Sequence, residues 1–237
     1  MRPEESTQLF DYRPLLNGDM SPHEAGLFEV EAESTLRALS TKQVATVHAS
    51  SVLSAHGAVI LIGISGTGKT TLALECARHG LPHIGDEFCY FSFGPANCWH
   101  IEYPIGIKMG SPFFRNALNI GTKALSPLGI ASLVCDRKQL LTEIGGTAAA
   151  CGIAHPYDLE AIICLRRMKA ASCCIDPLSV TKWTEQVLPS IDAPTSRNQL
   201  FNQLLAAVSS HHIRVAALRY SESREAASLL SRTFGEA

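Results

Sequence analysis

The chain has 237 residues, of which 46% are hydrophobic and 18% are charged, and its formal net charge is −2. This length and composition suit one well-buried globular domain with at most a small appendage. The lack of a basic excess argues against nucleic acid as a partner, because no positive charge is available to neutralise a phosphate backbone. The basic pairs Arg137-Lys138 and Arg166-Arg167 are too short to form a basic run.

The sequence also predicts a cytoplasmic location and no membrane partner. Residues 1–20 mix Glu, Asp and Arg without an apolar core segment, unlike a signal peptide. No apolar stretch approaches the length of a membrane span. The eight cysteines are scattered without metal-binding spacing, so we expect reduced thiols.

A clear structural pattern begins at residue 43. Residues 1–42 contain several chain breakers and one alternating stretch, so we expect an N-terminal extension packed on the core. Val44–Leu53 is rich in β-forming residues, and Ala58–Ile62 is wholly apolar, as suits a buried strand. Ala55-His56-Gly57 between them is a turn signal. The pattern predicts a β-hairpin whose second strand leads directly into the next segment.

The segment after the hairpin, Gly63-Ile64-Ser65-Gly66-Thr67-Gly68-Lys69-Thr70, matches the complete phosphate-binding loop pattern G-x-x-x-x-G-K-[ST]. Thr71–Arg78 predicts a helix that ends at His79-Gly80, with Pro82 just beyond. Strand, loop and helix therefore follow one another in the order that this motif requires. The sequence predicts that the protein binds a nucleoside triphosphate.

The expected chemistry of this loop follows from its glycines, its lysine and its hydroxyl. The glycines let the backbone curl so that successive N–H groups point at phosphate oxygens, and the first turn of the helix adds more free N–H groups. We expect Lys69 to reach the outer phosphates of ATP and Thr70 to hold Mg²⁺. The expected nucleotide-binding residues are Gly63, Ser65, Gly66, Thr67, Gly68, Lys69, Thr70 and Thr71.

The rest of the chain predicts further strands and helices of one α/β domain that spans residues 43–237. Phe88–Phe93 and Leu159–Leu165 favour strands, and Trp99–Met109 favours an interrupted strand pair. Residues 110–157 have an irregular pattern. The closing elements are predicted as helices over Thr181–Leu188, Gln199–Ser209 and Glu222–Ser231 and a strand over Val215–Tyr220.

An acidic pair, Asp86-Glu87, follows the short segment Leu81–Gly85 after the predicted helix. At a strand end near the phosphates, one carboxylate can accept a proton from an attacking hydroxyl while its neighbour helps to bind Mg²⁺. A solvated acidic turn is an equal alternative from the spacing alone. His48 lies in the first strand of the predicted hairpin, before the turn, and a histidine in a hairpin taken by itself favours a structural role.

The order of these motifs resembles the catalytic domain of the bacterial HPr serine kinase/phosphorylase family. The resemblance rests on Val47-His48-Ala49-Ser50-Ser51, His56-Gly57, the phosphate loop and Gly85-Asp86-Glu87, and it covers Val44 to Phe93. That family is similar in fold to ATP-dependent phosphoenolpyruvate carboxykinase. The resemblance therefore implies a P-loop domain with a mixed β-sheet and an ATP-dependent phosphotransferase activity.

The resemblance also implies a role for each matching residue. Lys69 and Thr70 belong at the phosphates and Mg²⁺. Asp86 activates the acceptor hydroxyl, Glu87 lies near the metal, and His48 lies beside the γ-phosphate. Lys108 matches a position where relatives often have arginine, which implies a charge contact with phosphate. An ordinary surface lysine is an equal alternative at that position.

Functions from different classes stay open. The leading one is a kinase that transfers the γ-phosphate to a hydroxyl of a protein, peptide or small molecule, with a serine of a protein or precursor peptide favoured. The alternative is a nucleotide-binding regulatory module or slow NTPase without a kinase acceptor. The glycine-rich, arginine-containing signature with which bifunctional family members dock HPr is missing from residues 110–150. Family members commonly form homo-oligomers. The sequence does not determine the oligomeric state, the identity of the acceptor or whether the reverse reaction occurs.

Overall fold

The fold is taken from a computed structural model of the chain. The structure describes residues 44–92, 94, 96–100, 104–120, 123–124, 132–151, 156–169, 172–187, 191–192 and 197–235. The N-terminal extension expected over residues 1–42 lies outside these described residues.

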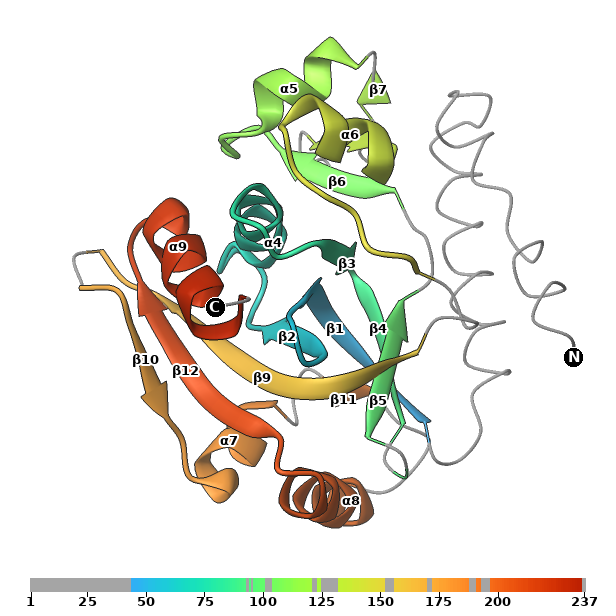
Figure 1. Cartoon of the computed structure of the whole chain (residues 1–237), viewed down its shortest axis with the longest axis vertical. Coiled ribbons are helices and arrows are strands. Elements are labelled where there is room, and N and C mark those ends of the chain that lie inside the picture. Colours follow the sequence, from blue (N-terminus) through green and yellow to red (C-terminus); the bar gives the residue numbers. More distant parts are fainter. Residues whose placement is uncertain are drawn as a thin grey trace, which may run out of the picture.

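A nine-stranded mixed sheet forms the centre of the described fold (Figure 1). Its strands are β1 (Val44–Leu53), β2 (Ala58–Ile62), β3 (His83–Gly85), β4 (Phe88–Ser92), β5 (Asn97–His100), β9 (Tyr157–Arg167), β10 (Cys174–Pro177), β11 (Ile191–Asp192) and β12 (Arg214–Tyr220). The main path is β10-β12-β9-β2-β1-β4-β5, and β3 and β11 each pair with β1. β9 is parallel to β2 and β12, and the other pairs are antiparallel. β5 also pairs with β9, so β9, β2, β1, β4 and β5 close into a ring.

β1 and β2 form the predicted hairpin, with Leu53 opposite Ala58 at its closed end. Ser54 closes the turn, because its N–H donates to Gly57 O at 2.8 Å and its Oγ accepts from the N–H of Gly57 at 3.1 Å. A Cβ built at Gly57 would lie 2.3 Å from Asp158 O, so only glycine fits where the turn meets β9. The hairpin thus leads from a tightly fixed turn through β2 into residues 63–70, the segment that matches the phosphate-loop pattern and is called the phosphate loop below.

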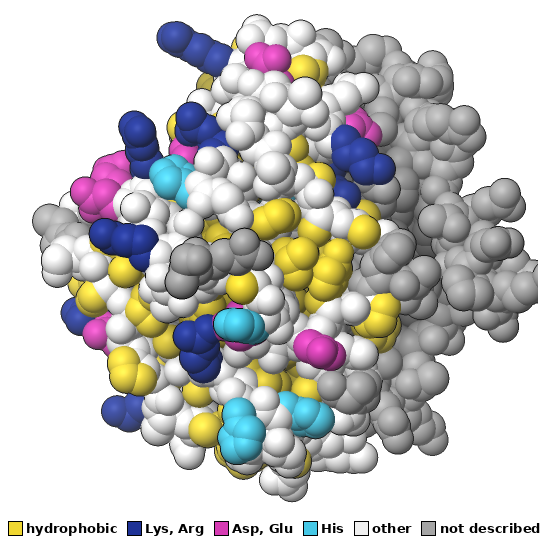
Figure 2. All heavy atoms as spheres, viewed as in Figure 1, with side chains coloured by type: hydrophobic (Ala, Val, Ile, Leu, Met, Phe, Trp, Pro, Cys, Tyr) yellow, Lys and Arg dark blue, Asp and Glu magenta, His cyan; other side chains and the backbone are white. Residues whose placement is uncertain are grey.

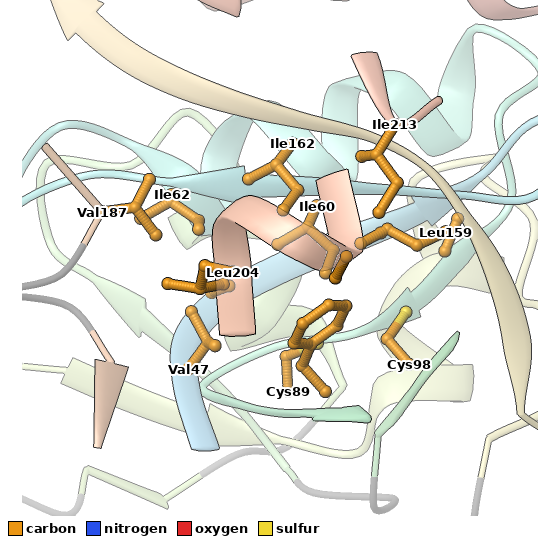
Figure 3. Packing of buried hydrophobic residues seen from close by; sticks show 14 of the residues in the cluster. Val47, Ile60, Ile62, Cys89, Cys98, Leu159, Ile162, Val187, Leu204 and Ile213 are labelled. Atoms are coloured by element: carbon orange, nitrogen blue, oxygen red, sulfur yellow. The ribbon is translucent and has the colours of Figure 1, made fainter. Parts of the chain in front are cut away.

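Helices cover both faces of the sheet (Figure 1). On one face, α4 (Lys69–Arg78) packs with α9 (Ser223–Phe234). On the other face lie α7 (Val180–Val187) and α8 (Arg197–Ser210), around Ile60 and Ile62 of β2 (Figure 3). Successive residues of a strand point to opposite faces, so a strand covered on both sides must be apolar throughout. This explains the wholly apolar sequence of β2, in which all five residues are buried.

A second, three-stranded antiparallel sheet has the order β6-β8-β7 and carries two short helices. Its elements are β6 (Ile105–Lys108), α5 (Phe114–Asn119), β7 (Lys123–Ala124), β8 (Ser132–Cys135) and α6 (Arg137–Glu143). Ile105, Phe113 and Leu140 share a core with Leu74 and Ala77 of α4, so this unit packs against the helix that follows the phosphate loop.

This second sheet corrects two predictions. Residues 110–157 are not irregular as a whole, and Trp99–Met109 is not a strand pair, because β5 belongs to the central sheet and β6 to the small one. The elements here have two to seven residues, too few to show a helical or strand period in the sequence. The predicted strands and helices from Leu159 onward are confirmed, whereas β10 and β11 were not predicted.

On the face drawn in Figure 2, acidic and basic side chains lie interspersed, and no broad patch of one sign extends across it. Within the part of the chain that the structure describes, no helix combines the length and apolarity needed to cross a membrane.

Candidate active site

The phosphate loop lies between the end of β2 and the first turn of α4, as predicted. Gly68 has φ +92°, in the left-handed region that favours glycine. A Cβ built at Gly63 would lie 2.7 Å from Thr67 Oγ1, so the loop closes too tightly for a side chain there. Thr67 holds this shape, since its N–H and Oγ1 both donate to Ile64 O, at 3.2 and 2.8 Å.

Lys69 folds back over the loop. Its ammonium group donates to Gly63 O at 2.9 Å, and the residue is only 7% exposed. Burial lowers the pKa of Lys69 below its ordinary value, while the nearby carboxylates of Glu87 and Asp86 oppose this shift. The lysine is therefore held in the cradle by one carbonyl and two acidic neighbours.

Asp86 is buried behind the loop, directly after β3. Its Oδ2 accepts from Thr70 Oγ1 at 2.8 Å, and its Oδ1 accepts from Ser50 Oγ. Burial raises the pKa of Asp86, as does the neighbouring Glu87, whereas the two hydroxyl donors act against the rise. Both carboxylate oxygens of Asp86 are thus engaged by hydroxyl groups from β1 and α4.

Glu87 points instead toward the open side. His48 Nε2 lies 2.7 Å from Glu87 Oε2, and the two side chains are 52% and 40% exposed. The hydrogen bond from His48 lowers the pKa of Glu87, against the effect of burial. Glu87 has φ +64°, a strained conformation for a residue with a side chain, and its carbonyl accepts from Ala49 N–H at 3.2 Å. The backbone therefore turns sharply between the two acidic residues and separates their environments.

These residues meet at one cleft of about 390 Å³, which we call the loop cleft. It lies where the phosphate loop faces the small sheet. Its lining residues are His48, Ser65, Gly66, Gly68, Lys69, Thr70, Thr71, Glu87, Gly106, Ile107, Lys108, Gly110, Ser111 and Arg167.

Most of the residues predicted from the sequence line the loop cleft. His48, Lys69, Thr70, Glu87 and Lys108 all do so, although they come from both sheets and from α4. Gly63 and Thr67 contribute by shaping the loop, and Asp86 acts from behind it through Thr70. The structure therefore brings the predicted residues together in two layers, one facing the cleft and one supporting it.

Three residues of the site were not predicted from the sequence. Ser50 donates to Asp86, and Tyr220, at the end of β12, donates its hydroxyl to Thr67 O. Burial raises the pKa of Tyr220 to about 12, which keeps this donor protonated. Arg167, at the end of β9, lines the cleft. The sequence signal for Arg167 was only the short basic pair that it forms with Arg166.

No cluster of three or more His, Cys, Asp or Glu residues suited to a metal ion occurs among the described residues. None of the eight cysteines, all of which the structure describes, forms a disulfide bond.

No family model matches the sequence, and neither does any curated protein. Among solved structures, the chain is similar to the HPr(Ser) kinase/phosphatase from Coxiella burnetii, with 11% sequence identity and a TM-score of 0.31. The match covers 79% of this chain and 91% of that chain. A similarity at this level does not assign the chain to a family, so functional inference depends on the site itself.

Proposed function

We propose that the protein is an ATP- and Mg²⁺-dependent kinase that transfers the γ-phosphate of ATP to a hydroxyl group. The observation that carries the proposal is the convergence of a complete phosphate loop, the Thr70–Asp86 contact and the His48–Glu87 contact on one cleft. A nucleotide-binding loop needs only the first of these. A base held at the cleft surface is the additional part that hydroxyl activation requires.

The loop fits the phosphates of ATP. Gly66 and Gly68 line the loop cleft without side chains, and a Cβ at Gly63 would lie 2.7 Å from Thr67 Oγ1, so the tight loop shape depends on glycine there. The first turn of α4 presents N–H groups and the positive end of the helix dipole to an anion. Lys69 already lies over the loop, so on ligand binding its ammonium group exchanges the Gly63 carbonyl for phosphate oxygens.

Thr70 and Asp86 fit Mg²⁺. Hard oxygen donors are what this cation prefers, and the Thr70 hydroxyl is held 2.8 Å from Asp86 Oδ2. The Thr70 hydroxyl, oriented by Asp86, would hold the cation, which would supply positive charge to offset the negative charge of the phosphates. Asp86 is fixed in turn by Ser50, so it orients the Thr70 hydroxyl from a rigid position.

The hydrogen bonds favour Glu87 as the group that accepts the proton of the attacking hydroxyl. Glu87 lines the cleft and is partly exposed, whereas Asp86 is buried and has both oxygens occupied. His48 orients the Glu87 carboxylate through the contact at 2.7 Å. This assignment reverses the roles that the family resemblance implies, in which Asp86 activates the acceptor hydroxyl and Glu87 lies near the metal. The earlier assignment stays a prediction, and the two can be told apart by experiment.

The acceptor class follows from the resemblance of the motif order, which favours a serine of a protein or precursor peptide. The transfer itself needs the acceptor hydroxyl to lie in line with the γ-phosphate and next to Glu87. A nucleotide-responsive module or slow NTPase is the alternative, and it uses the same loop without a positioned acceptor.

The test uses the full chain, Mg²⁺ and γ-labelled ATP with an extract of the source organism separated into protein, peptide and small-molecule fractions. We expect label in one acceptor fraction. Glu87→Gln should abolish transfer while the dissociation constant for Mg²⁺–ATP changes less than about twofold, because a base is lost and the cradle is kept. Asp86→Asn should weaken Mg²⁺-dependent ATP binding.

Two outcomes contradict parts of this proposal. Label that is released only as free phosphate by the wild-type protein excludes the kinase and supports the slow NTPase. Transfer that survives Glu87→Gln but is lost in Asp86→Asn, with nucleotide binding intact, restores Asp86 as the base.

A further inference from the structure

Arg167 has a position in the fold that no motif of the sequence assigns. It is the last residue of β9, which lies parallel and adjacent to β2. Ile62, the last residue of β2, pairs with Cys164. Arg167 therefore stands three residues, or about 10 Å of strand, beyond the point where β2 ends and the phosphate loop begins.

At that distance the side chain reaches the loop. Its Nη1 atom would lie 4.0 Å from a Cβ built at Gly68, the residue directly before Lys69. Arg167 is exposed. It lines the loop cleft together with Lys69, which is buried, and Lys108. Three cations from β9, α4 and β6 thus line the same cleft.

The guanidinium of Arg167 has no carboxylate partner among the described residues, unlike three other arginines of the sheet and helices. Arg214 pairs with Glu160, and Arg219 pairs with Asp176. Arg78 pairs with Glu75. An arginine left unpaired beside a phosphate-binding loop offers its planar fork of N–H donors to a phosphate, which that fork matches bidentately.

We propose that Arg167 contacts the outer phosphates of bound ATP and neutralises the charge that develops on the leaving ADP during transfer. This inference rests on the proposed kinase function. In the transfer, the bond between the γ-phosphorus and the β–γ bridging oxygen breaks, and a bond from the acceptor oxygen to the same phosphorus forms. The acceptor proton goes to Glu87, and the electron pair of the broken bond stays on ADP, where Arg167 faces it. Charge stabilisation at developing oxyanions is a large part of phosphoryl-transfer catalysis.

The chain supplies a matched control. Arg166 precedes Arg167 on β9, is also exposed, and points to the opposite side because strand residues alternate. It does not line the loop cleft. Arg166→Gln removes the same charge and the same side-chain type one residue away, so it isolates the effect of position from that of net charge.

The experiment compares Arg167→Gln, Arg167→Lys and Arg166→Gln in the full chain. For each variant, the dissociation constants of ATP, ADP and AMP are measured by titration calorimetry, together with label transfer at saturating ATP. We expect Arg167→Gln to weaken ATP and ADP binding about tenfold and to leave AMP binding unchanged, with kcat lower by about 100-fold. Arg167→Lys should recover part of both losses, and Arg166→Gln should stay within about twofold of wild type.

The proposal is overturned if Arg167→Gln and Arg166→Gln bind ATP and ADP equally well and transfer at equal rates. It is also overturned if AMP binding falls as much as ADP binding, because the contact would then not be with the outer phosphates. A wild-type protein that binds ATP and transfers nothing defeats the kinase function instead. In that case the ATP and ADP affinities of Arg167→Gln and Arg166→Gln still decide whether Arg167 contacts the phosphates. Thermal unfolding of each variant shows whether the fold is kept, as expected for an exposed side chain.

Discussion

The imidazole of His48 lies 2.7 Å from the carboxylate of Glu87 and so connects β1, the first strand of the hairpin, to the turn after β3. The contact is completed by the backbone, since Ala49 N–H donates to Glu87 O. Glu87 is held at φ +64° in this arrangement. A strained residue that is fixed on both its side chain and its carbonyl is a common feature of functional sites.

The first prediction concerns His48 as a positioning residue for Glu87. His48→Phe removes the donor at Glu87 Oε2, so the carboxylate loses its orientation toward the cleft, and we expect kcat to fall by about tenfold or more. His48→Gln keeps a side-chain N–H donor and should retain more activity. Steady-state kinetics check the result, because a positioning role lowers kcat and leaves the KM for ATP nearly unchanged. Equal rates in the Phe and Gln variants would contradict it.

The second prediction concerns the Thr70 hydroxyl, which donates to Asp86 at 2.8 Å. Thr70→Val keeps the shape of the side chain but removes the hydroxyl, and Thr70→Ser keeps the hydroxyl. We expect Thr70→Val to bind ATP in Mg²⁺ only as tightly as it does in EDTA, because the oxygen that fits the cation is gone. Thr70→Ser should still bind ATP more tightly with Mg²⁺. Calorimetric titration of ATP with and without EDTA measures the difference, and a full Mg²⁺ effect in Thr70→Val would exclude the role.

The part of the site that could be predicted from the sequence is the part built from local chemistry. The apolar run of β2, the glycines of the loop and the helix after Lys69 are recognisable within twenty residues, and all three form as predicted. Asp86 and Glu87 were also found from their place after a strand. Their separate environments could not be predicted, because these depend on a backbone turn at Glu87 and on partners in β1.

The remaining residues of the site come from distant elements that only the topology brings close. Arg167 and Tyr220 are the last residues of the parallel strands β9 and β12. No local sequence pattern predicts that these strands lie beside β2 in this order. The small sheet that supplies Lys108 is made of strands of two to four residues, too short for a periodic signal. The sequence therefore predicted the loop, and the family resemblance added Lys108, but neither pointed to Arg167 or Tyr220.

The third prediction concerns Tyr220, whose buried hydroxyl donates to Thr67 O beneath the loop. Tyr220→Phe removes this support, so the loop is less well organised for phosphate. We expect ATP to bind about fivefold more weakly, which corresponds to roughly 1 kcal/mol for one hydrogen bond. Tyr157→Phe is the matched control, because Tyr157 also donates to a carbonyl, Ala150 O at 2.9 Å, away from the loop. Equal ATP affinities in the two variants would show that the Tyr220 hydroxyl does not organise the loop.

The fourth prediction concerns His83, which is completely buried in β3, three residues before Asp86. Neither of its ring nitrogens has a hydrogen-bond partner among the described residues. Burial lowers the pKa of His83 well below 6.5, and the nearby Arg137 and His100 lower it further. The folded protein therefore holds this ring neutral at pH values where the unfolded chain protonates it.

The sign of the pH dependence follows from this difference. Below pH 6.5, the ordinary pKa of histidine, the unfolded state binds a proton that the folded state does not, so the free energy of unfolding falls as the pH falls. One such group contributes a slope of up to about 1.4 kcal/mol per pH unit. Above pH 6.5 its contribution is constant. Chemical denaturation between pH 5 and pH 8 measures the curve, and His83→Leu, which cannot titrate, should reduce the slope below pH 6.5. Parallel curves for the two proteins would contradict the prediction, as would an NMR shift of the His83 ring signals between pH 7 and pH 5 in the folded wild-type protein.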